Sequence, residues 1–335
     1  MTDAAITVRL FLLTQGSAAR FRRRACPVIP RMESTQVMMR RLRSVSLLLC
    51  VALLSGGAAS SADAPTVHMD VAYAADHQAQ RLDAYLAKSD RPVPAMLYIH
   101  GGGWRAGSKN RLPGWLTSAV NEGWLSVISV EYRFTDVAPH PAQVNDCVRA
   151  MQFVRSRAQQ WNIDTNRIGV TGGSAGAHLS LWLALHDDTA DPSSSDPVQR
   201  QSSRAACAVS FAGPTDWSLL AEIEHKHPAY RQLLGYEPGT PALEMSSAAK
   251  ADVSPISFVT KDDPPILLVH GDNDVIVPVR HASKLHEHLQ AAGGNAELFV
   301  VKGANHAVAG AGGNVSQRAV GFVRRHLKTD QDDNQ

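Results

Sequence analysis

The sequence predicts an α/β protein, with a twisted and mostly parallel sheet of eight strands and with helices on both faces of that sheet. Segments of strand and of helix character alternate from about residue 65 almost to the end of the 335-residue chain, the pattern of parallel strands joined by right-handed crossovers. Several strand segments are continuously apolar, as strands covered on both faces are. The polar motifs follow such strands, at the sheet edge where α/β proteins bind ligands.

Eight segments have the length and the residue types of β-strands. In chain order they are residues 67–73, 81–86, 95–100, 125–131, 168–171, 206–212, 265–270 and 296–301. The first two are expected to pair across a polar turn at 75–79. The third, Ala-Met-Leu-Tyr-Ile-His, is nearly unbroken in its apolar character, which predicts a strand buried in the middle of the sheet.

Five segments are predicted to be helices, namely residues 112–122, 143–159, 177–185, 280–292 and 315–327. The second of them places Val144, Cys147, Met151 and Val154 on one face, as an amphipathic helix does.

One domain over residues 65–328 fits this alternation better than two. Residues 187–204 are polar and predict a surface loop. Residues 215–263 hold short amphipathic pieces and many turn residues, so they are predicted to form a small cap-like insertion over the site. Residues 329–335 are expected to be a disordered tail.

The uneven charge of the chain argues against a nucleic-acid partner. The formal net charge is +2, but residues 1–64 hold nine of the 33 Lys and Arg residues and three of the 31 Asp and Glu residues. The rest of the chain keeps 24 basic and 28 acidic side chains, a net charge of about −4. No basic patch remains for nucleic acid or for an anionic membrane.

The positive charge belongs to a leader that resembles an export signal. A cationic stretch around Arg40 precedes an apolar run of about ten residues at 45–54 and small residues at 55–64, with cleavage expected near 59–64. The run is too short for a permanent membrane anchor. A signal peptide normally lies at the N-terminus, but 37 residues precede Met38 here. Translation is therefore expected to start further along the chain, at Met32, Met38 or Met39. An organellar transit peptide is the alternative, and export to the periplasm or the medium is the prediction.

Four cysteines do not form a disulfide framework. Cys26 and Cys50 belong to the leader, and Cys147 and Cys207 lie in apolar segments. Two buried free thiols are favoured over a disulfide, although pairing remains open.

The strongest chemical signal is Gly172-Gly173-Ser174-Ala175-Gly176, between an apolar strand and an apolar helix. A serine hydroxyl becomes a nucleophile when a tight strand-to-helix turn exposes it beside a base, and small neighbours are needed because the turn is crowded. The pattern predicts Ser174 as the nucleophile.

A second signal, His100-Gly101-Gly102-Gly103-Trp104, follows the third strand. Attack on an ester creates an oxyanion that needs fixed N–H donors about 3 Å away, and glycines allow that close approach. We predict the amides of Gly102, Gly103 and Ala175 as donors, with His100 and Gly101 in support. A phosphate loop is not predicted, because the sequence lacks G-x-G-x-x-G spacing and a following Lys-Ser/Thr.

The acid and the base are expected after the serine, in that order. Asp274 lies in His270-Gly-Asp-Asn-Asp274 after a buried strand and is favoured as the acid, with Asp272 as the alternative that would satisfy a turn. His306 follows the last strand and is the predicted base.

Other histidines and tryptophans are given structural roles. His178 is expected to pack beneath the site, and His140 to be a loop residue. The predicted helices are expected to carry His281, His286, His288 and His326 at their surface. Trp104, Trp115 and Trp217 are expected to pack or to line a substrate pocket. Glu224-His225-Lys226-His227 lacks metal-site spacing, so neither a metal nor a cofactor is expected.

From about residue 67 to 327 the chain resembles the bacterial carboxylesterase and feruloyl-esterase-like (BD-FAE-like) branch of the α/β-hydrolases, near the hormone-sensitive-lipase-like family. The resemblance rests on several motifs in the same order: residues 100–109, 131–133, Pro141-Ala142 with Asp146, 167–179, 270–274 and Asn305-His306. It implies the α/β-hydrolase fold and a Ser174–His306–Asp274 triad. Ala177 departs from the pattern, because a glycine is common at that position.

The resemblance implies a carboxylic ester hydrolase that acts on small or polysaccharide-linked esters. A formamidase or amidase with the same triad is the alternative. A prolyl-oligopeptidase-like peptidase has no room for its accessory domain, and an inactive binding scaffold would be expected to lack a triad member. The sequence carries no signal of the oligomeric state.

Overall fold

The eight predicted strands form one sheet in the computed structural model, which describes residues 64–220 and 227–327. The strands are β1 (Thr66–Ala72), β2 (Arg81–Leu86), β3 (Val93–Ile99), β4 (Ser126–Val130), β5 (Ile163–Gly173), β6 (Ala208–Phe211), β7 (Ile266–Gly271) and β8 (Ala296–Val301). Their spatial order is β1-β2-β4-β3-β5-β6-β7-β8. The β1–β2 and β2–β4 pairs are antiparallel and the other five pairs are parallel. The predicted fold class is thereby confirmed.

The predicted leader and tail lie outside the described residues, so export and the tail remain predictions. Within the described ranges no helix is long and apolar enough to span a membrane.

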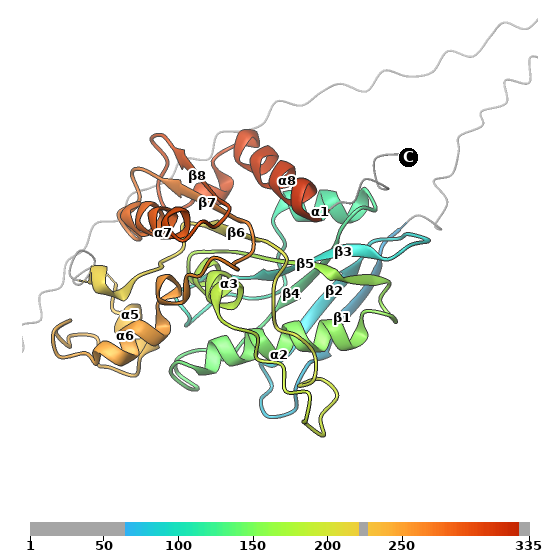
Figure 1. The fold of residues 1–335 in the computed structure, drawn as a ribbon, viewed down its shortest axis with the longest axis horizontal. Helices are drawn as coiled ribbons and strands as arrows, with labels where there is room; N and C mark the ends of the chain where they lie inside the picture. The colour runs from blue at the N-terminus through green and yellow to red at the C-terminus, as the bar shows by residue number, and fades with distance from the viewer. Residues whose placement is uncertain (1–63, 221–226, 328–335) are drawn as a thin grey trace, which may run out of the picture. The chain divides into compact units, whose positions relative to one another are not determined.

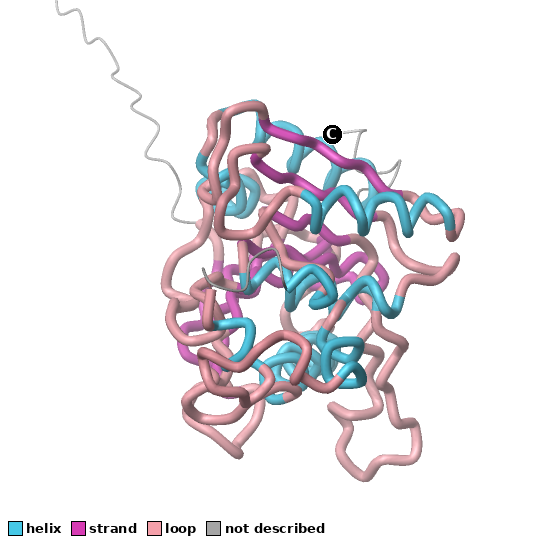
Figure 2. Tube along the Cα trace, turned by 90° about the vertical axis from the view of Figure 1, so that its left-hand side faces the viewer, coloured by secondary structure: helices cyan, strands magenta, loops and turns pink. Residues whose placement is uncertain are grey.

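The main helices are α1 (Gly114–Asn121), α2 (Ala142–Arg157), α3 (Ala175–Leu185), α7 (Arg280–Ala291) and α8 (Gly313–Leu327). They lie on both faces of the sheet (Figures 1 and 2). Side chains of α2, α3 and α7 join one apolar core, and side chains of α1 and α8 join the core of the opposite face. Each fully buried Leu or Phe in these cores stabilises the fold by about 1.5–3 kcal/mol.

The strand β5 is longer than predicted, since it starts at Ile163 rather than at 168. Residues 163–167, Ile-Asp-Thr-Asn-Arg, have no apolar pattern. Val93 nevertheless pairs with Ile163, with a register shift between that pair and the next. Backbone pairing extends a strand where its side chains reach solvent, and an apolar pattern cannot report such a stretch.

The two thiols lie on opposite faces of the sheet. Cys147 belongs to the core under α2, whereas Cys207 belongs to the core under α1 and α8. Both are free and buried, which confirms the favoured prediction. Burial raises the pKa of both thiols, that of Cys207 to about 12.

The described residues between β6 and β7 form short helical turns rather than strands. They are η1 (Trp217–Leu219), α5 (Ala229–Leu233), α6 (Ser247–Val253) and η2 (Pro255–Phe258); another short turn, η3 (Val308–Gly310), follows β8. The carbonyls of Asp252 and Val253, at the end of α6, accept hydrogen bonds from Trp182 Nε1 and from His178 Nε2 on α3. Figure 1 shows α5 and α6 grouped at the same end of the molecule. This segment thus packs against the helix that follows Ser174.

Candidate active site

The turn between β5 and α3 holds Ser174 in a strained conformation. Its φ is 55° and its ψ is −121°, a backbone region that a residue with a Cβ rarely occupies. The turn also lies tightly against the end of β3: a Cβ at Gly172 would lie 2.5 Å from the Ile99 carbonyl oxygen, and one at Gly176 would lie 2.0 Å from it. The two glycines are therefore required for the turn that presents the Ser174 hydroxyl.

Three side chains distant in the sequence meet at this turn. His306, on the loop after β8, has Nε2 2.9 Å from Ser174 Oγ. Its Nδ1 lies 2.8 Å from Asp274 Oδ2, on the loop after β7. With Nδ1–H donating to Asp274, Nε2 is free to accept the proton of the serine hydroxyl.

The Asp274 carboxylate is buried and fully engaged. Its Oδ1 accepts hydrogen bonds of 2.9 Å from the amides of Ile276 and Val277, and His270 Nε2 lies 3.4 Å from Oδ2. Burial alone would raise the pKa of Asp274, but the hydrogen bonds from His270, His306 and Val277 outweigh it and hold the pKa well below its usual range. Asp274 is thus ionised at neutral pH and can stabilise a positive charge on His306.

Asp272, the alternative acid, lies elsewhere. Its exposed carboxylate accepts a 2.6 Å hydrogen bond from the amide of Gly303, which links the loop after β7 to the loop after β8. The structure places Asp274, not Asp272, against His306.

The glycine loop after β3 lies beside the serine. A Cβ at Gly101 would lie 2.7 Å from the Gly173 carbonyl and 3.4 Å from Ser174 Cβ. The His100 ring braces this loop, with Nδ1 2.8 Å from the Gly101 carbonyl oxygen and Nε2 2.8 Å from Glu131 Oε1. These contacts link the loop to the end of β4, and Glu131 is a partner to which the sequence analysis assigned no role.

Three amides near Ser174 are available as donors. Gly102 and Gly103 have φ values of 120° and 61°, and a Cβ at Gly102 would lie 1.9 Å from the Ala106 carbonyl oxygen. No hydrogen bond within the described residues uses the N–H of Gly102, Gly103 or Ala175. The amide of Ser174 itself donates to the Phe211 carbonyl, so it is not available.

An aromatic cluster fills the space beneath the glycine loop. Trp104 and Trp217 are 2% and 1% exposed, so they pack in the interior and do not line an open pocket, and Trp115 is buried against the opposite face. The buried His178 accepts a hydrogen bond at Nδ1 from Trp104 Nε1 and contacts Trp217. This confirms the packing predicted for His178.

The prediction of a surface position for His281 is wrong. Its side chain is fully buried, and Nδ1 faces the amides of Thr215 and Asp216 at 3.1 and 3.3 Å. The spacing of His281, Leu285 and Leu289, four residues apart, places all three on the buried face of α7. This spacing is the sequence feature from which the buried position of His281 could have been predicted.

Two buried histidines are expected to make the protein sensitive to mild acid. Burial lowers the pKa values of His178 and His281 to about 3, and protonation at Nδ1 would oppose the N–H donors that face it. Below pH ~6.5 the unfolded chain therefore binds more protons than the folded chain does. The stability that these groups contribute is complete above that pH and falls toward pH 3, by roughly 1 kcal/mol per pH unit for each histidine.

Urea unfolding between pH 7 and 5 measures this slope. His281→Asn keeps an acceptor for the two amides and is expected to reduce the slope, whereas His288→Asn, at an exposed position of the same helix, should leave it unchanged. Equal slopes for the unmodified protein, His281→Asn and His288→Asn would contradict the role given to His281.

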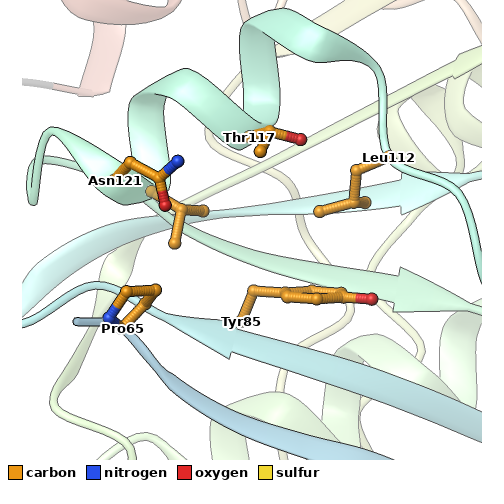
Figure 3. Close-up of a pocket in the computed structure, with 6 residues that line it drawn as sticks. Pro65, Tyr85, Leu112, Thr117 and Asn121 are labelled. Carbon is orange, nitrogen blue, oxygen red and sulfur yellow. The ribbon is translucent and has the colours of Figure 1, made fainter. Parts of the chain in front are cut away.

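A separate pocket lies away from this site. Its volume is about 180 Å³, it lies between β2 and α1, and Figure 3 shows the side chains of Pro65, Tyr85, Leu112, Thr117 and Asn121 around it. It is lined mainly by apolar groups and lies on the face of the sheet that α1 covers, and none of the candidate residues lines it. Ala177, the departure from the expected glycine, is accommodated because glycine stands opposite it, where a Gly213 Cβ would lie 2.8 Å from Ala177 Cβ.

Over residues 64–220 and 227–327 no group of three or more His, Cys, Asp or Glu side chains could hold a metal ion. Of the cluster at 224–227, residues 224–226 lie outside the described residues.

Comparison with known proteins identifies esterases. The BD-FAE family model matches residues 82–289. A relative in Mycobacterium tuberculosis, "Probable carboxylic ester hydrolase LipM", is 30% identical over 219 residues, which are 64% of this chain and 49% of the relative. The chain spans about half the length of the curated relatives it matches.

Two solved structures resemble the chain over most of their length. A truncated carbohydrate esterase from gut microbiota has a TM-score of 0.71 and 26% identity, and the match covers 81% of this chain and 99% of that one. An acetyl ester-xyloside bifunctional hydrolase from Caldicellulosiruptor lactoaceticus has a TM-score of 0.60 and 28% identity, with 74% and 84% covered.

Proposed function

Because the chain belongs to the BD-FAE family and has the fold of α/β-hydrolase esterases, we propose that it is a serine hydrolase of carboxylic esters. The observation that carries the proposal is the hydrogen-bonded series from Ser174 Oγ through His306 to Asp274. Together with three unused amides beside the serine, it supplies a nucleophile, a base and donors for an oxyanion.

In the proposed acylation, Ser174 Oγ attacks the ester carbonyl carbon while His306 Nε2 accepts the hydroxyl proton. The carbonyl oxygen becomes an oxyanion, which the amides of Gly102, Gly103 and Ala175 stabilise. The bond to the alcohol oxygen then breaks, and His306 returns its proton to the leaving alcohol. Asp274 stays ionised and stabilises the imidazolium.

In the proposed deacylation, water enters with His306 as base and attacks the acyl-serine. The oxyanion forms again at the same amides, the Ser174 ester bond breaks, and the proton on His306 returns to Ser174 Oγ. The products are the carboxylic acid and the alcohol, and the enzyme is regenerated.

The names of two structural relatives support a carbohydrate-linked ester as substrate. One is a carbohydrate esterase and the other an acetyl ester-xyloside bifunctional hydrolase. Small esters and polysaccharide-linked acetyl or hydroxycinnamoyl esters are therefore the substrates proposed for this chain.

A substrate panel tests the proposed reaction. Chromogenic esters, acetylated sugars, hydroxycinnamate esters and matched amides and formamides would be assayed with the same protein. We expect hydrolysis of the esters at kcat/KM values at least 100-fold above those of the amides. Preferential cleavage of amides or formamides would contradict the proposal.

We also propose that the stretch from Arg40 to Ala64 directs export. Its charged, apolar and small-residue regions follow the order of a signal peptide. N-terminal sequencing of the secreted protein is expected to find a start between Asp63 and Thr66; a mature chain that retains Arg40 would refute export by this signal.

A further inference from the structure

A polar pocket of about 360 Å³ lies next to the glycine loop. Three segments line it, each from the loops that follow strands at the site's end of the sheet. Arg105 comes from the loop after β3, and Asp136 from the loop after β4. The segment that starts in α5 contributes Gln232, Tyr236, Glu237 and Pro238.

The pocket is joined to the proposed oxyanion loop by direct contacts. The amide of Arg105 donates to the Gly102 carbonyl at 3.2 Å, and Arg105 Nη1 donates to Gln232 Oε1 at 2.8 Å. One turn before Gln232, Ala229 lies against the glycine loop, 3.5 Å from where a Cβ of Gly103 would be. The wall of the pocket is therefore continuous with the loop whose amides face the reacting carbonyl.

The chain length limits the distance between the pocket and the nucleophile. Gly101 lies against Ser174, and Arg105 follows Gly101 by four positions, a stretch of chain that spans at most about 14 Å. A folded turn between Gly102 and Ala106 shortens that span. The backbone of Arg105 therefore lies within about 14 Å of the glycine that contacts Ser174, a separation that a glycan-linked ester can bridge.

The charges in the pocket favour a neutral ligand. Arg105 is one cation, and Asp136 and Glu237 are two carboxylates, so an anionic ligand would meet a net negative lining. Within the described part of the chain neither carboxylate takes part in a hydrogen bond or an ion pair. Both can accept from ligand hydroxyls, and Arg105 retains N–H donors beyond the one on Gln232.

The remaining lining adds ring side chains to these polar groups. The rings are those of Tyr236 and Pro238, and Tyr236 Oη accepts a hydrogen bond from the amide of Ser246. A neutral sugar ring has an apolar C–H face and hydroxyls that both donate and accept, so it matches this combination. Arg105, Asp136 and Glu237 are exposed to solvent, so a purely aliphatic alcohol would displace their water without replacing its hydrogen bonds, whereas sugar hydroxyls can replace them.

We propose that this pocket, the Arg105 pocket, binds a neutral sugar ring in the alcohol part of the substrate. The assignment rests on the proposed function, because it names the substrate class of the Ser174 site. It makes Arg105 and Glu237 determinants of specificity for glycan-linked esters.

Two acetyl esters that share the acyl group test the proposal. The probes are p-nitrophenyl acetate, which has no sugar, and acetylated xylo-oligosaccharide. Arg105→Ala is expected to lower kcat/KM for the sugar ester at least tenfold more than for p-nitrophenyl acetate, mainly through KM. Glu237→Gln should shift the same ratio about threefold to tenfold. Arg111→Ala, at an exposed arginine outside the pocket, is the matched control and should not change the ratio.

A binding measurement separates this proposal from the reaction. Unesterified xylo-oligosaccharide is titrated by calorimetry into folded Ser174→Ala protein, with and without Arg105→Ala. Weaker binding in the double variant supports the pocket even where catalysis is absent, and equal binding, or none in Ser174→Ala, overturns it. An unchanged ratio of the two esters in both pocket variants also overturns it. Failure of the unmodified protein to cleave any ester refutes the proposed function alone.

Discussion

Replacing Ser174 or His306 with alanine is expected to lower kcat for ester hydrolysis by about 10⁴ to 10⁶. Ser174 supplies the atom that takes up the acyl group, and His306 Nε2 lies 2.9 Å from it, in position to remove its proton. The double variant should be only slightly slower than either single variant, because a nucleophile without its base, or a base without its nucleophile, contributes little. Steady-state and single-turnover kinetics measure these effects.

Two controls are needed to interpret any hydrolysis that remains in the Ser174 and His306 variants. Circular dichroism should show that each variant is folded, and a serine-directed phosphonate should label the unmodified protein at Ser174 but not Ser174→Ala. Near-normal hydrolysis by folded Ser174→Ala, free of other esterases, would refute the assignment of the nucleophile.

Asp274→Asn is expected to lower kcat by about 10³ to 10⁴, whereas Asp272→Asn should change it less than about threefold. An amide at position 274 can present an N–H to His306 Nδ1, which favours the wrong tautomer and removes the charge that stabilises the imidazolium. Asp272 instead accepts a hydrogen bond from the exposed Gly303 amide, and the oxygen of an asparagine can do the same.

The pair of conservative variants is a matched comparison, since both remove one negative charge from the same loop. Thermal unfolding of both proteins checks that the difference lies in catalysis. A severe kinetic loss in Asp272→Asn with a mild one in Asp274→Asn would reverse the roles given to the two carboxylates.

Much of the candidate site could be predicted because each of its parts lies in a short sequence motif, although the motifs are far apart in the chain. Ser174 lies between an apolar strand and an apolar helix, and only glycine fits at Gly172 and Gly176. Parallel strands end at one edge, so the loops that carry Asp274 and His306 had to meet near that turn. The contact of His306 with Ser174, and that of Asp274 with His306, are consistent with that topology.

The supporting contacts could not be predicted in the same way. Glu131 meets His100 across 31 residues of chain, and Val253 accepts from His178 across 75. Such pairs depend on the register of strands and on the path of irregular segments, which no short pattern encodes. The pocket at Arg105 belongs to the same class, because its walls come from three separate loops.

The placement of Cys147 and Cys207 on opposite faces of the sheet has a practical consequence. The backbone of the sheet separates the two sulfur atoms, so no rearrangement short of unfolding could join them, and their raised pKa values keep them protonated and unreactive toward disulfide exchange. In the part of the chain that the structure describes, folding therefore needs neither an oxidant nor a disulfide isomerase. The same native state should form in a reducing cytosol and in an oxidising medium.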